Sequence, residues 1–307
     1  MPPPTSAPMS FLENPAGITV HEHVPLAGCT TWKTGGLARY LIDVESLKAL
    51  REALLYLREM RMRILALGNG SNVLIADAGF DGAVIRLRGR AAFTKVSGEL
   101  LEAGAGAPLG VVALTAARAS LGGLEFSCGI PGTVGGAVMT NAGASSGSTA
   151  LVLAEARALT IDCEDVIFDV FEDVYRQPLV PPGHIVTSAT FRLGHTSPES
   201  IKSLMSEARS KREATQPVGL ASAGCVFKNP AGDSAGRLLE ECGVKGASVG
   251  RASVSRVHAN FIINNGGARA DDIKKLMGLM ALEVESRFAV RLEPEVRLIG
   301  FEEEFSW

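Results

Sequence analysis

The sequence predicts an α+β fold with a larger first part and a smaller second part. Short apolar runs typical of strands alternate with a few amphipathic helical segments along the 307 residues. One strand runs into a glycine-rich loop that leads to another strand, whereas a regular strand–helix–strand unit would have a helix there. The composition changes again near residue 197, where Ser-Pro-Glu opens a helix. These observations indicate two α+β parts joined near residues 195–200.

The first part is expected to begin its regular structure after a turn at residues 34–38. We expect strands over residues 39–44, 63–67, 73–76, 84–87 and 98–106, and further strands within 151–170 and 184–193. A helix over 111–121 is rich in alanine and ends before two glycines. The helix expected over 45–60 has an apolar face that predicts a role in the core, formed by Leu47, Leu50, Leu54, Leu55 and Leu57.

The second part, residues 197–307, is expected to hold helices over 197–214, 234–242 and 270–288 and strands over 259–264 and 290–299. Residues 1–16 are rich in proline and serine, so we expect them to be disordered. The remaining residues, 17–196, form the first part, with a division expected near residues 90 and 91.

The bulk composition narrows the class of function. The net charge of −3 argues against nucleic acid or an anionic membrane surface as the main partner. The chain has no apolar run of membrane length, and its first ten residues lack the features of a signal peptide, so we expect a cytoplasmic protein. Its five cysteines have neither disulfide nor metal spacing, so we expect free thiols and no metal site.

The most informative stretch is residues 122–147, which is dense in glycine. It contains Gly122, Gly123, Gly129, Gly132, Gly135, Gly136, Gly143 and Gly147. Because glycine is costly in helices and strands, we expect a loop whose bare peptide N–H groups can approach a phosphate closely. A set of tight turns between strands is the alternative, although it would explain fewer glycines.

A second glycine loop, Gly68-Asn69-Gly70-Ser71-Asn72, lies upstream. It is not a P-loop, because no Gly-Lys-Ser/Thr closes it. Taken alone it is typical of a hairpin turn. Together, the two loops predict that backbone amides hold the diphosphate of a cofactor without the usual helix N-terminus.

Five motifs in order resemble one enzyme family. They are GNGSN, GLEFSCGIPGTVGGAVMTNAGA, SAGCVFKNP, HANFIINNG and LEPEVRLIG, and the resemblance runs over about residues 31–300. The chain resembles the UDP-N-acetylenolpyruvoylglucosamine reductases (UDP-N-acetylmuramate dehydrogenases), in the shorter type that lacks an inserted substrate-covering loop. The resemblance implies a two-part FAD-binding region of the PCMH type over 17–196, with subdomains 17–90 and 91–196, and a substrate-binding domain over 197–307.

The resemblance also implies the ligands and the residues that bind them. FAD is the expected cofactor, NADPH the reductant, and a UDP-sugar enolpyruvyl ether the small-molecule substrate. Besides the second glycine loop, the implied FAD-binding residues are Ile130, Pro131, Gly132, Val134, Gly135, Gly136, Asn141 and Gly143. Tyr175, Lys228 and Asn229 are the implied substrate-binding residues.

In the implied reaction, NADPH reduces FAD, and hydride then passes to C3 of the enolpyruvyl group. Negative charge builds at C2 and spreads into the carboxylate, so the site needs a cation and an acid. Arg176, which follows Tyr175, is implied to be the cation, because a guanidinium stays charged and can fork onto a carboxylate. The local sequence alone favours a solvated arginine at a strand end, and only the order of the motifs reverses that interpretation. Pro178 stands where the family usually has serine.

Cys225 occupies the position at which most members of the family carry the serine that protonates C2. A thiol with a reference pKa of about 8.5 is mostly protonated at neutral pH and could supply that proton. Its alternative role is a small buried hydrophobe. Glu295 is implied to be a second acidic participant; it could instead lie with Glu293 and Arg297 on the exposed face of an edge strand.

Several residues are weaker candidates or departures from the family pattern. Gln216, Arg237 and Asn260 are possible substrate contacts, and His258 is predicted to be structural rather than a base. The departures are Pro178, Ser145 in place of tyrosine, and Arg251 in place of glycine. They leave two alternatives open: another FAD oxidoreductase of the same cofactor-binding fold, and a non-catalytic protein that binds flavin or a sugar nucleotide.

Overall fold

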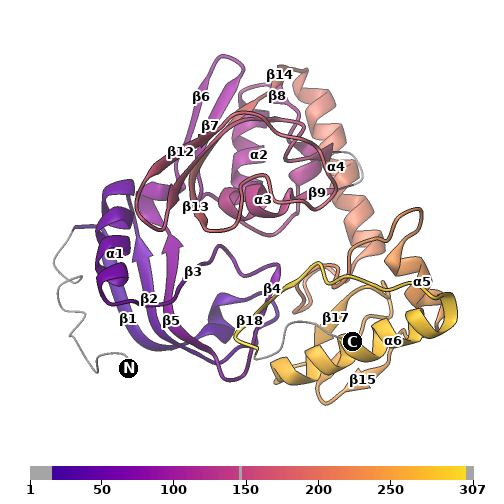
Figure 1. Ribbon diagram of the computed structural model, residues 1–307. Coiled ribbons are helices and arrows are strands. Elements are labelled where there is room, and N and C mark those ends of the chain that lie inside the picture. The colour runs from indigo at the N-terminus through magenta and orange to yellow at the C-terminus, as the bar shows by residue number, and fades with distance from the viewer. Residues whose placement is uncertain (1–15, 145–146, 302–307) are drawn as a thin grey trace. The chain divides into compact units, whose positions relative to one another are not determined.

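The computed structural model describes residues 16–144 and 147–301 (Figure 1). Its contacts divide the chain into two units. The first unit holds the described residues up to 22, together with 40–69 and 82–210, and the second holds 23–39, 70–81 and 211 onward. The predicted disordered residues other than Ala16, as well as Ser145 and the acidic residues 302–304, lie outside the described residues. The mixture of helices and strands in both units confirms the α+β class.

The first sheet has the order β1-β2-β5-β3, with β3 and β5 parallel. Its strands are β1 (Ile18–Pro25), β2 (Leu37–Val44), β5 (Phe80–Leu87) and β3 (Ile64–Ala66). Helix α1 (Leu47–Glu59) begins after Ser46, whose side chain accepts a hydrogen bond from the amide of Ala49 at 3.1 Å. Of the predicted apolar face, Leu50, Leu54 and Leu57 are buried in this sheet's core. Leu47 and Leu55 are exposed, and Leu55 lies about 100° around the helix axis from Leu54.

The second sheet of the first unit is antiparallel, in the order β12-β11-β13-β7-β6. Its strands are β12 (Asp165–Phe168), β11 (Leu153–Thr160), β13 (His184–Arg192), β7 (Leu100–Gly104) and β6 (Thr94–Ser97). Helices α2 (Leu109–Arg118) and α3 (Val134–Thr140) pack apolar side chains into the same core. Two short strand pairs, β8 (Leu121–Gly122) with β14 (Gly194–His195) and β9 (Gly143–Ala144) with β10 (Gly147–Ser148), flank the glycine-rich stretch.

Helix α3 corrects the expectation that the glycine-rich stretch contains no helix. Thr133 caps the helix, because its Oγ1 accepts a hydrogen bond from the amide of Gly136 at 3.3 Å. A glycine in a helix costs about 1 kcal/mol relative to alanine. Here close packing offsets that cost: a Cβ added at Gly135 would lie 3.0 Å from the Cβ of Ala105. Asn141, in the left-handed conformation with φ 41°, ends the helix.

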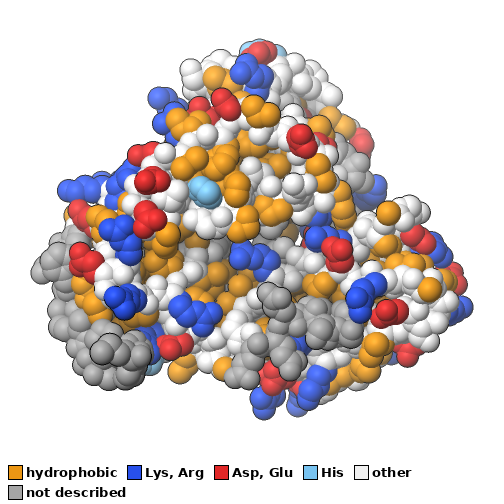
Figure 2. Space-filling model, viewed as in Figure 1, with side chains coloured by type: hydrophobic (Ala, Val, Ile, Leu, Met, Phe, Trp, Pro, Cys, Tyr) orange, Lys and Arg blue, Asp and Glu red, His pale blue; other side chains and the backbone are white. Residues whose placement is uncertain are grey.

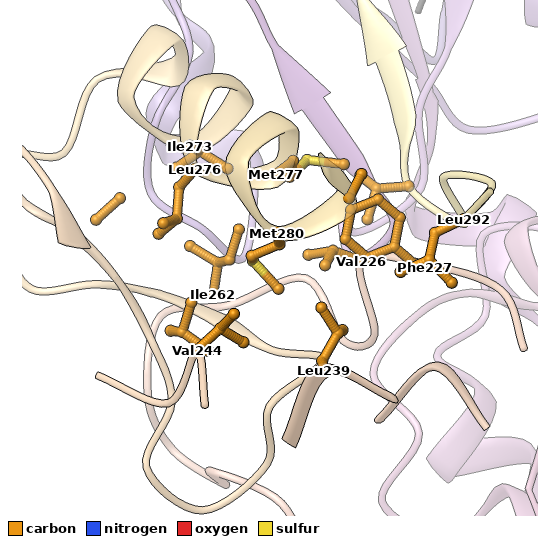
Figure 3. Packing of buried hydrophobic residues seen from close by; sticks show 14 of the residues in the cluster. Val226, Phe227, Leu239, Val244, Ile262, Ile273, Leu276, Met277, Met280 and Leu292 are labelled. Atoms are coloured by element: carbon orange, nitrogen blue, oxygen red, sulfur yellow. The ribbon is translucent and has the colours of Figure 1, made fainter. Parts of the chain in front are cut away.

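The second unit has its own core, in which helix α6 (Ala270–Phe288) covers a three-stranded antiparallel sheet (Figure 3). The strands are β15 (Ser248–Val249), β16 (Ala252–Val254) and β17 (Ile262–Asn264), and helix α5 (Ala235–Glu241) packs nearby. Trp32, fully buried, belongs to the same core and donates its Nε1–H to the carbonyl of Ile262 at 2.8 Å. Asp77 stabilises the start of α6, because its carboxylate accepts hydrogen bonds from the backbone amides of Ala270 and Asp271 at 3.0 and 3.1 Å.

The strand expected over residues 290–299 is wrong for most of its length. Only β18 (Arg297–Ile299) forms, and it pairs in parallel with β4 (Val73–Ile75). Upstream, Pro294 makes one isolated bridge with Phe227, and Glu295 lies in a bend. The chain bends at Glu295 and Val296, so the pairing at Pro294 does not continue into β18. Glu293, Glu295 and Arg297 therefore do not share one face of a regular strand.

The surface carries both positively and negatively charged side chains. Lys and Arg side chains are interspersed with Asp and Glu on the face shown in Figure 2. Within the first unit, Arg51 pairs with Asp165, and Arg58 pairs with Asp162 at 3.1 Å. Helix α4 (Pro198–Thr215) buries a single residue, Ile201. Among the described residues, no helix has the length and apolar character needed to cross a membrane.

Candidate functional site

The two glycine segments meet inside the first unit. A Cβ added at Gly68 would lie 2.6 Å from Oγ1 of Thr133, so no larger residue fits there without movement. Gly68 follows β3, and Thr133 precedes α3. The structure therefore brings together the start of the upstream loop and the centre of the long glycine-rich stretch. They meet at the N-terminus of helix α3, so the expectation that the two loops would act without a helix N-terminus is wrong.

The backbone of these segments offers N–H groups of the kind that bind the diphosphate of a flavin nucleotide. Within residues 16–144 and 147–301, the amide groups of Gly68, Asn69, Gly132 and Thr133 have no protein acceptor. Thr133 is buried and Gly68 half-buried, and buried amides are normally paired. Peptide N–H groups that converge without charged side chains are a common donor set for a diphosphate. The cofactor that the sequence implied thus has a matching set of donors.

Other implied FAD-binding residues use their amides within the protein. Ile130 donates to the carbonyl of Ser127 at 3.0 Å, Val134 to Ala107 at 2.9 Å, and Gly135 to Ala105 at 2.9 Å. These residues position the turn rather than offering their N–H groups to a ligand. Pro131 and Gly136 are exposed beside them, and Pro131 has no amide hydrogen to give.

Asn141 holds the end of the glycine-rich stretch to a neighbouring segment. Its Nδ2 donates to Asp173 Oδ1 and to the carbonyl of Val174, both at 3.1 Å, and its Oδ1 accepts the amide of Ala150 at 3.0 Å. The side chain is buried, with 2% exposure for the residue. Its polar atoms thus connect residue 141 with Ala150, Asp173 and Val174.

Arg176 lies beside the same end of the stretch. Its Nη1 and Nη2 donate to the carbonyls of Asn141 and Gly143, both at 3.3 Å. The guanidinium carbon is 5.3 Å from the ring centre of Tyr175, which is exposed. Arg176 adopts a left-handed backbone conformation with φ 55°, which is uncommon for a residue with a side chain. The structure thus places Arg176 next to Gly143, with the ring of Tyr175 beside the guanidinium.

In the second unit, the backbone brings the segments of Cys225 and Glu295 together. The amide of Glu295 donates to the carbonyl of Val226 at 2.9 Å, and the amide of Lys228 donates to the carbonyl of Glu293 at 2.8 Å. These two bonds align residues 226–228 with residues 293–295. Cys225, next to the first bond, is partly buried, as is Glu295.

The upstream glycine loop also reaches this part of the second unit. Nδ2 of Asn72 donates to the carbonyl of Glu295 at 3.1 Å. The preceding Gly70, with φ 61°, packs against the chain at Cys29, since an added Cβ would lie 2.2 Å from the Cys29 carbonyl oxygen. Asn72 is therefore bound to the segment of Glu295, and Gly70 is required by close backbone packing.

The implied substrate-binding residues of this unit differ in their availability. Lys228 Nζ lies 3.4 Å from Glu293 Oε2, in a partly exposed pair. Oδ1 of Asn229 accepts the amide of Ala235 at 3.1 Å, which ties it to the start of α5. Lys228 keeps a charged group at the surface, whereas one oxygen of Asn229 has a structural partner.

Asn260 is a structural residue that the sequence suggested only as a weak substrate contact. Its Oδ1 accepts the amide of Phe227 at 3.0 Å, and its Nδ2 donates to the carbonyl of Phe227 at 2.8 Å. Its own carbonyl accepts the amide of Val226 at 2.9 Å. With 1% exposure, Asn260 clamps the residues between Cys225 and Lys228 from the side opposite Glu295.

His258 and Arg237 also have structural partners. Nδ1 of His258 accepts the amide of Asn260 at 3.2 Å, and burial lowers the pKa of this histidine below its ordinary value. Arg237 forms a forked pair with Asp233, with Nε 2.8 Å from Oδ1, and its hydrogen bonds lower the pKa of that carboxyl to about 2. His258 therefore binds the backbone at Asn260, and Arg237 binds the side chain of Asp233.

Sequence reasoning missed Thr133 and Asp173. Thr133 combines a helix cap with an amide that has no acceptor among the described residues, and a threonine before Val-Gly-Gly-Ala is a possible capping signal. Asp173 accepts hydrogen bonds from Asn141 and Ser148. No local pattern marks it, because these donors are 32 and 25 residues away along the chain.

Comparison with known proteins agrees with this geometry. Residues 38–164 match the family model described as FAD binding domain, which confirms the predicted cofactor. Residues 216–299 match the model described as UDP-N-acetylenolpyruvoylglucosamine reductase, C-terminal domain. The two matches cover the parts of the chain that carry the glycine segments and the Cys225 and Glu295 segments.

Whole-chain relatives carry the same description. The UDP-N-acetylenolpyruvoylglucosamine reductase of Synechococcus sp. (strain WH7803) is 41% identical over 299 residues, covering 92% of this chain and 94% of the relative. That of Caldicellulosiruptor bescii is 40% identical over 295 residues, covering 94% and 93%. The crystal structure of UDP-N-acetylenolpyruvylglucosamine reductase (MurB) from Thermus caldophilus is 38% identical, with a TM-score of 0.80 over 92% of this chain and 99% of that one. The chain therefore belongs to the UDP-N-acetylenolpyruvoylglucosamine reductase family.

Proposed function

We propose that this protein reduces the enolpyruvyl ether of UDP-N-acetylglucosamine to UDP-N-acetylmuramate, with NADPH as the reductant. The observation that carries the proposal is the family match over the whole length, since both the flavin-binding part and the C-terminal part are represented in one chain. The product is a precursor of peptidoglycan, so the protein would act in the cytoplasm in cell-wall synthesis and thereby in cell shape and division.

Bound FAD would supply the hydride chemistry, and the protein would bind, orient and protonate the substrate. Gly68, Asn69, Gly132 and Thr133 would hold the diphosphate of FAD through their four amides. Residues 17–196, in two subdomains, would form the FAD-binding region, and residues 197–307 the substrate-binding domain.

Cys225 would give the proton to C2 of the substrate. The two residues that follow it, Val226 and Phe227, are hydrogen-bonded to Asn260 and to Glu295, which suits a segment that must hold a thiol at one place. Glu295 would orient or relay that proton. Because a thiol and a hydroxyl are both small proton donors, serine at position 225 should retain much of the activity.

Charged and polar groups would bind the rest of the substrate. Arg176 would stabilise the negative charge that develops in the enolate and its carboxylate, because guanidinium remains charged at all relevant pH values. Lys228 would offer a point charge to the diphosphate or the carboxylate. Tyr175 and Asn229 would contribute polar contacts.

The proposal is tested by supplying the two substrates separately in the absence of oxygen. The purified protein should be yellow, NADPH should bleach it, and the enolpyruvyl substrate should restore the colour and yield UDP-N-acetylmuramate. A flavin oxidase of the same fold would instead turn over without NADPH. A preparation that binds no FAD, or a reduced protein that the enolpyruvyl substrate does not reoxidise, contradicts the proposal.

A further inference from the structure

The carboxylate of Asp173 joins three segments of the first unit. Its Oδ1 accepts a hydrogen bond from Asn141 Nδ2 at 3.1 Å and another from Ser148 Oγ at 2.6 Å. Asn141 ends helix α3, Ser148 ends β10, and Asp173 lies three residues before Arg176. The Asp173 oxygen is thus a shared acceptor at the place where the glycine-rich stretch turns back.

The position of Arg176 depends on the same junction. Both of its terminal nitrogens donate to carbonyls of the stretch, those of Asn141 and Gly143. The side-chain amide of Asn141 in turn holds Asp173 and the carbonyl of Val174, so the segment before Arg176 is bound to the residue that receives its guanidinium. Movement at Asn141 would therefore move both the backbone and the guanidinium of Arg176.

Backbone strain indicates that this junction is tightly constrained. Arg176 and Asn141 are both left-handed, with φ 55° and 41°. A non-glycine residue in this region costs of the order of 1 kcal/mol and persists where the surroundings fix it. Hydrogen bonds through Asp173 and Asn141 supply such a constraint.

We propose that Asp173 is a positioning residue, which through Asn141 fixes the guanidinium of Arg176 for the carboxylate of the substrate. This inference rests on the proposed function of Arg176. Both donors to Asp173 are uncharged, so the role requires an acceptor oxygen and not a negative charge. The D173N variant keeps such an oxygen in its side-chain amide, whereas the D173A variant removes it.

The test compares two ligands that differ in the group Arg176 would bind. Calorimetric titration of the FAD-loaded protein measures the affinity for the enolpyruvyl ether of UDP-N-acetylglucosamine and for UDP-N-acetylglucosamine, which lacks the enolpyruvyl carboxylate. The wild type should prefer the carboxylate-bearing ligand. In D173A that preference should fall by about threefold to tenfold, the scale of one ordinary hydrogen bond. In D173N it should be largely retained.

E172A is the matched control. Glu172 is the neighbouring acid, exposed, and its side chain makes no hydrogen bond in the described part of the chain. It should keep the wild-type preference. The inference is overturned if D173A keeps the wild-type preference for the carboxylate-bearing ligand, because Asp173 then has no effect on carboxylate binding. It is also overturned if D173A loses affinity for both ligands equally, because the substitution then disturbs the site in general. A wild type that binds neither ligand contradicts the proposed function instead.

Crystal structures give a readout that is independent of the substrate. In D173N, the Arg176 guanidinium should remain within hydrogen-bond distance of the carbonyls of Asn141 and Gly143. In D173A the Arg176 guanidinium should lose at least one of these two hydrogen bonds. An unmoved guanidinium in D173A overturns the positioning role whatever the substrate is.

Discussion

Replacing Asn260 by alanine should destabilise the second unit strongly. The substitution removes the partners of both the amide and the carbonyl of Phe227, a residue with no exposed surface. An unpaired buried polar group costs about 1–3 kcal/mol, so two of them should lower the free energy of unfolding by about 2–6 kcal/mol. The same loss should increase the mobility of the segment between Cys225 and Lys228.

The assay is urea unfolding followed by the fluorescence of Trp32, which is buried in the same core as Phe227. The matched control is Asn265→Ala. Nδ2 of Asn265 also makes two hydrogen bonds, to the carbonyl of Arg251 at 3.2 Å and to Ser253 Oγ at 2.9 Å, but the residue is exposed. Water can replace those bonds, so the control should lose only about 0.5 kcal/mol.

The result that refutes this reasoning is a comparable loss in the two variants. A loss below about 1 kcal/mol for Asn260→Ala would mean that the clamp on Phe227 is not needed for the fold. Asn260→Asp keeps an acceptor for the Phe227 amide but places a carboxylate oxygen against the Phe227 carbonyl in a buried site. It should therefore lose at least as much stability as the alanine variant.

Three further predictions concern the cofactor, a helix cap and pH. Gly68→Ala should weaken FAD retention, measured as flavin absorbance per protein, because its Cβ would lie 2.6 Å from Thr133 Oγ1. Asp77→Ala should cost about 1–2 kcal/mol in the same urea assay, because it removes the acceptor for two amides at the start of α6. Burial lowers the pKa of His258 in the folded protein, so the unfolded chain binds its proton more readily. The free energy of unfolding should therefore fall as the pH drops below about 6.5, and less so in His258→Gln.

Each of these predictions has a result that contradicts it. Gly110→Ala is the control for the cofactor experiment, since an added Cβ meets nothing within 4 Å; equal flavin content in the two alanine variants would remove Gly68 from the cofactor loop. For Asp77→Ala, an unchanged urea midpoint would mean that water satisfies the first amides of α6 as effectively as Asp77 does. For His258, the same pH dependence in the glutamine variant would assign the effect to other groups.

Local sequence signals predicted the regular elements that are determined locally. The helix at residues 270–288 was predicted with its observed bounds, because its buried apolar residues recur at helical spacing. Helix α3 was missed because propensity counts the cost of glycine, whereas the close approach of Gly135 to Ala105 depends on tertiary packing. The strand after residue 290 was overextended because alternating charges outweighed Pro294 in the interpretation.

The candidate site shows the same division. The two glycine segments could be found from composition, because bare backbone is itself the signal. Their convergence at Gly68 and Thr133 needed the fold. The roles of Asn260 and Asp173 could not be predicted from local sequence, since each depends on partners that are distant along the chain.

The most direct test of the account concerns the proton source at Cys225. Flavin in the wild type, Cys225→Ala and Cys225→Ser is first reduced by NADPH without oxygen and then mixed rapidly with the enolpyruvyl substrate. All three proteins should be reduced by NADPH, and the wild type and the serine variant should be reoxidised by substrate, whereas the alanine variant should not. Reoxidation of the alanine variant at the wild-type rate would contradict the account.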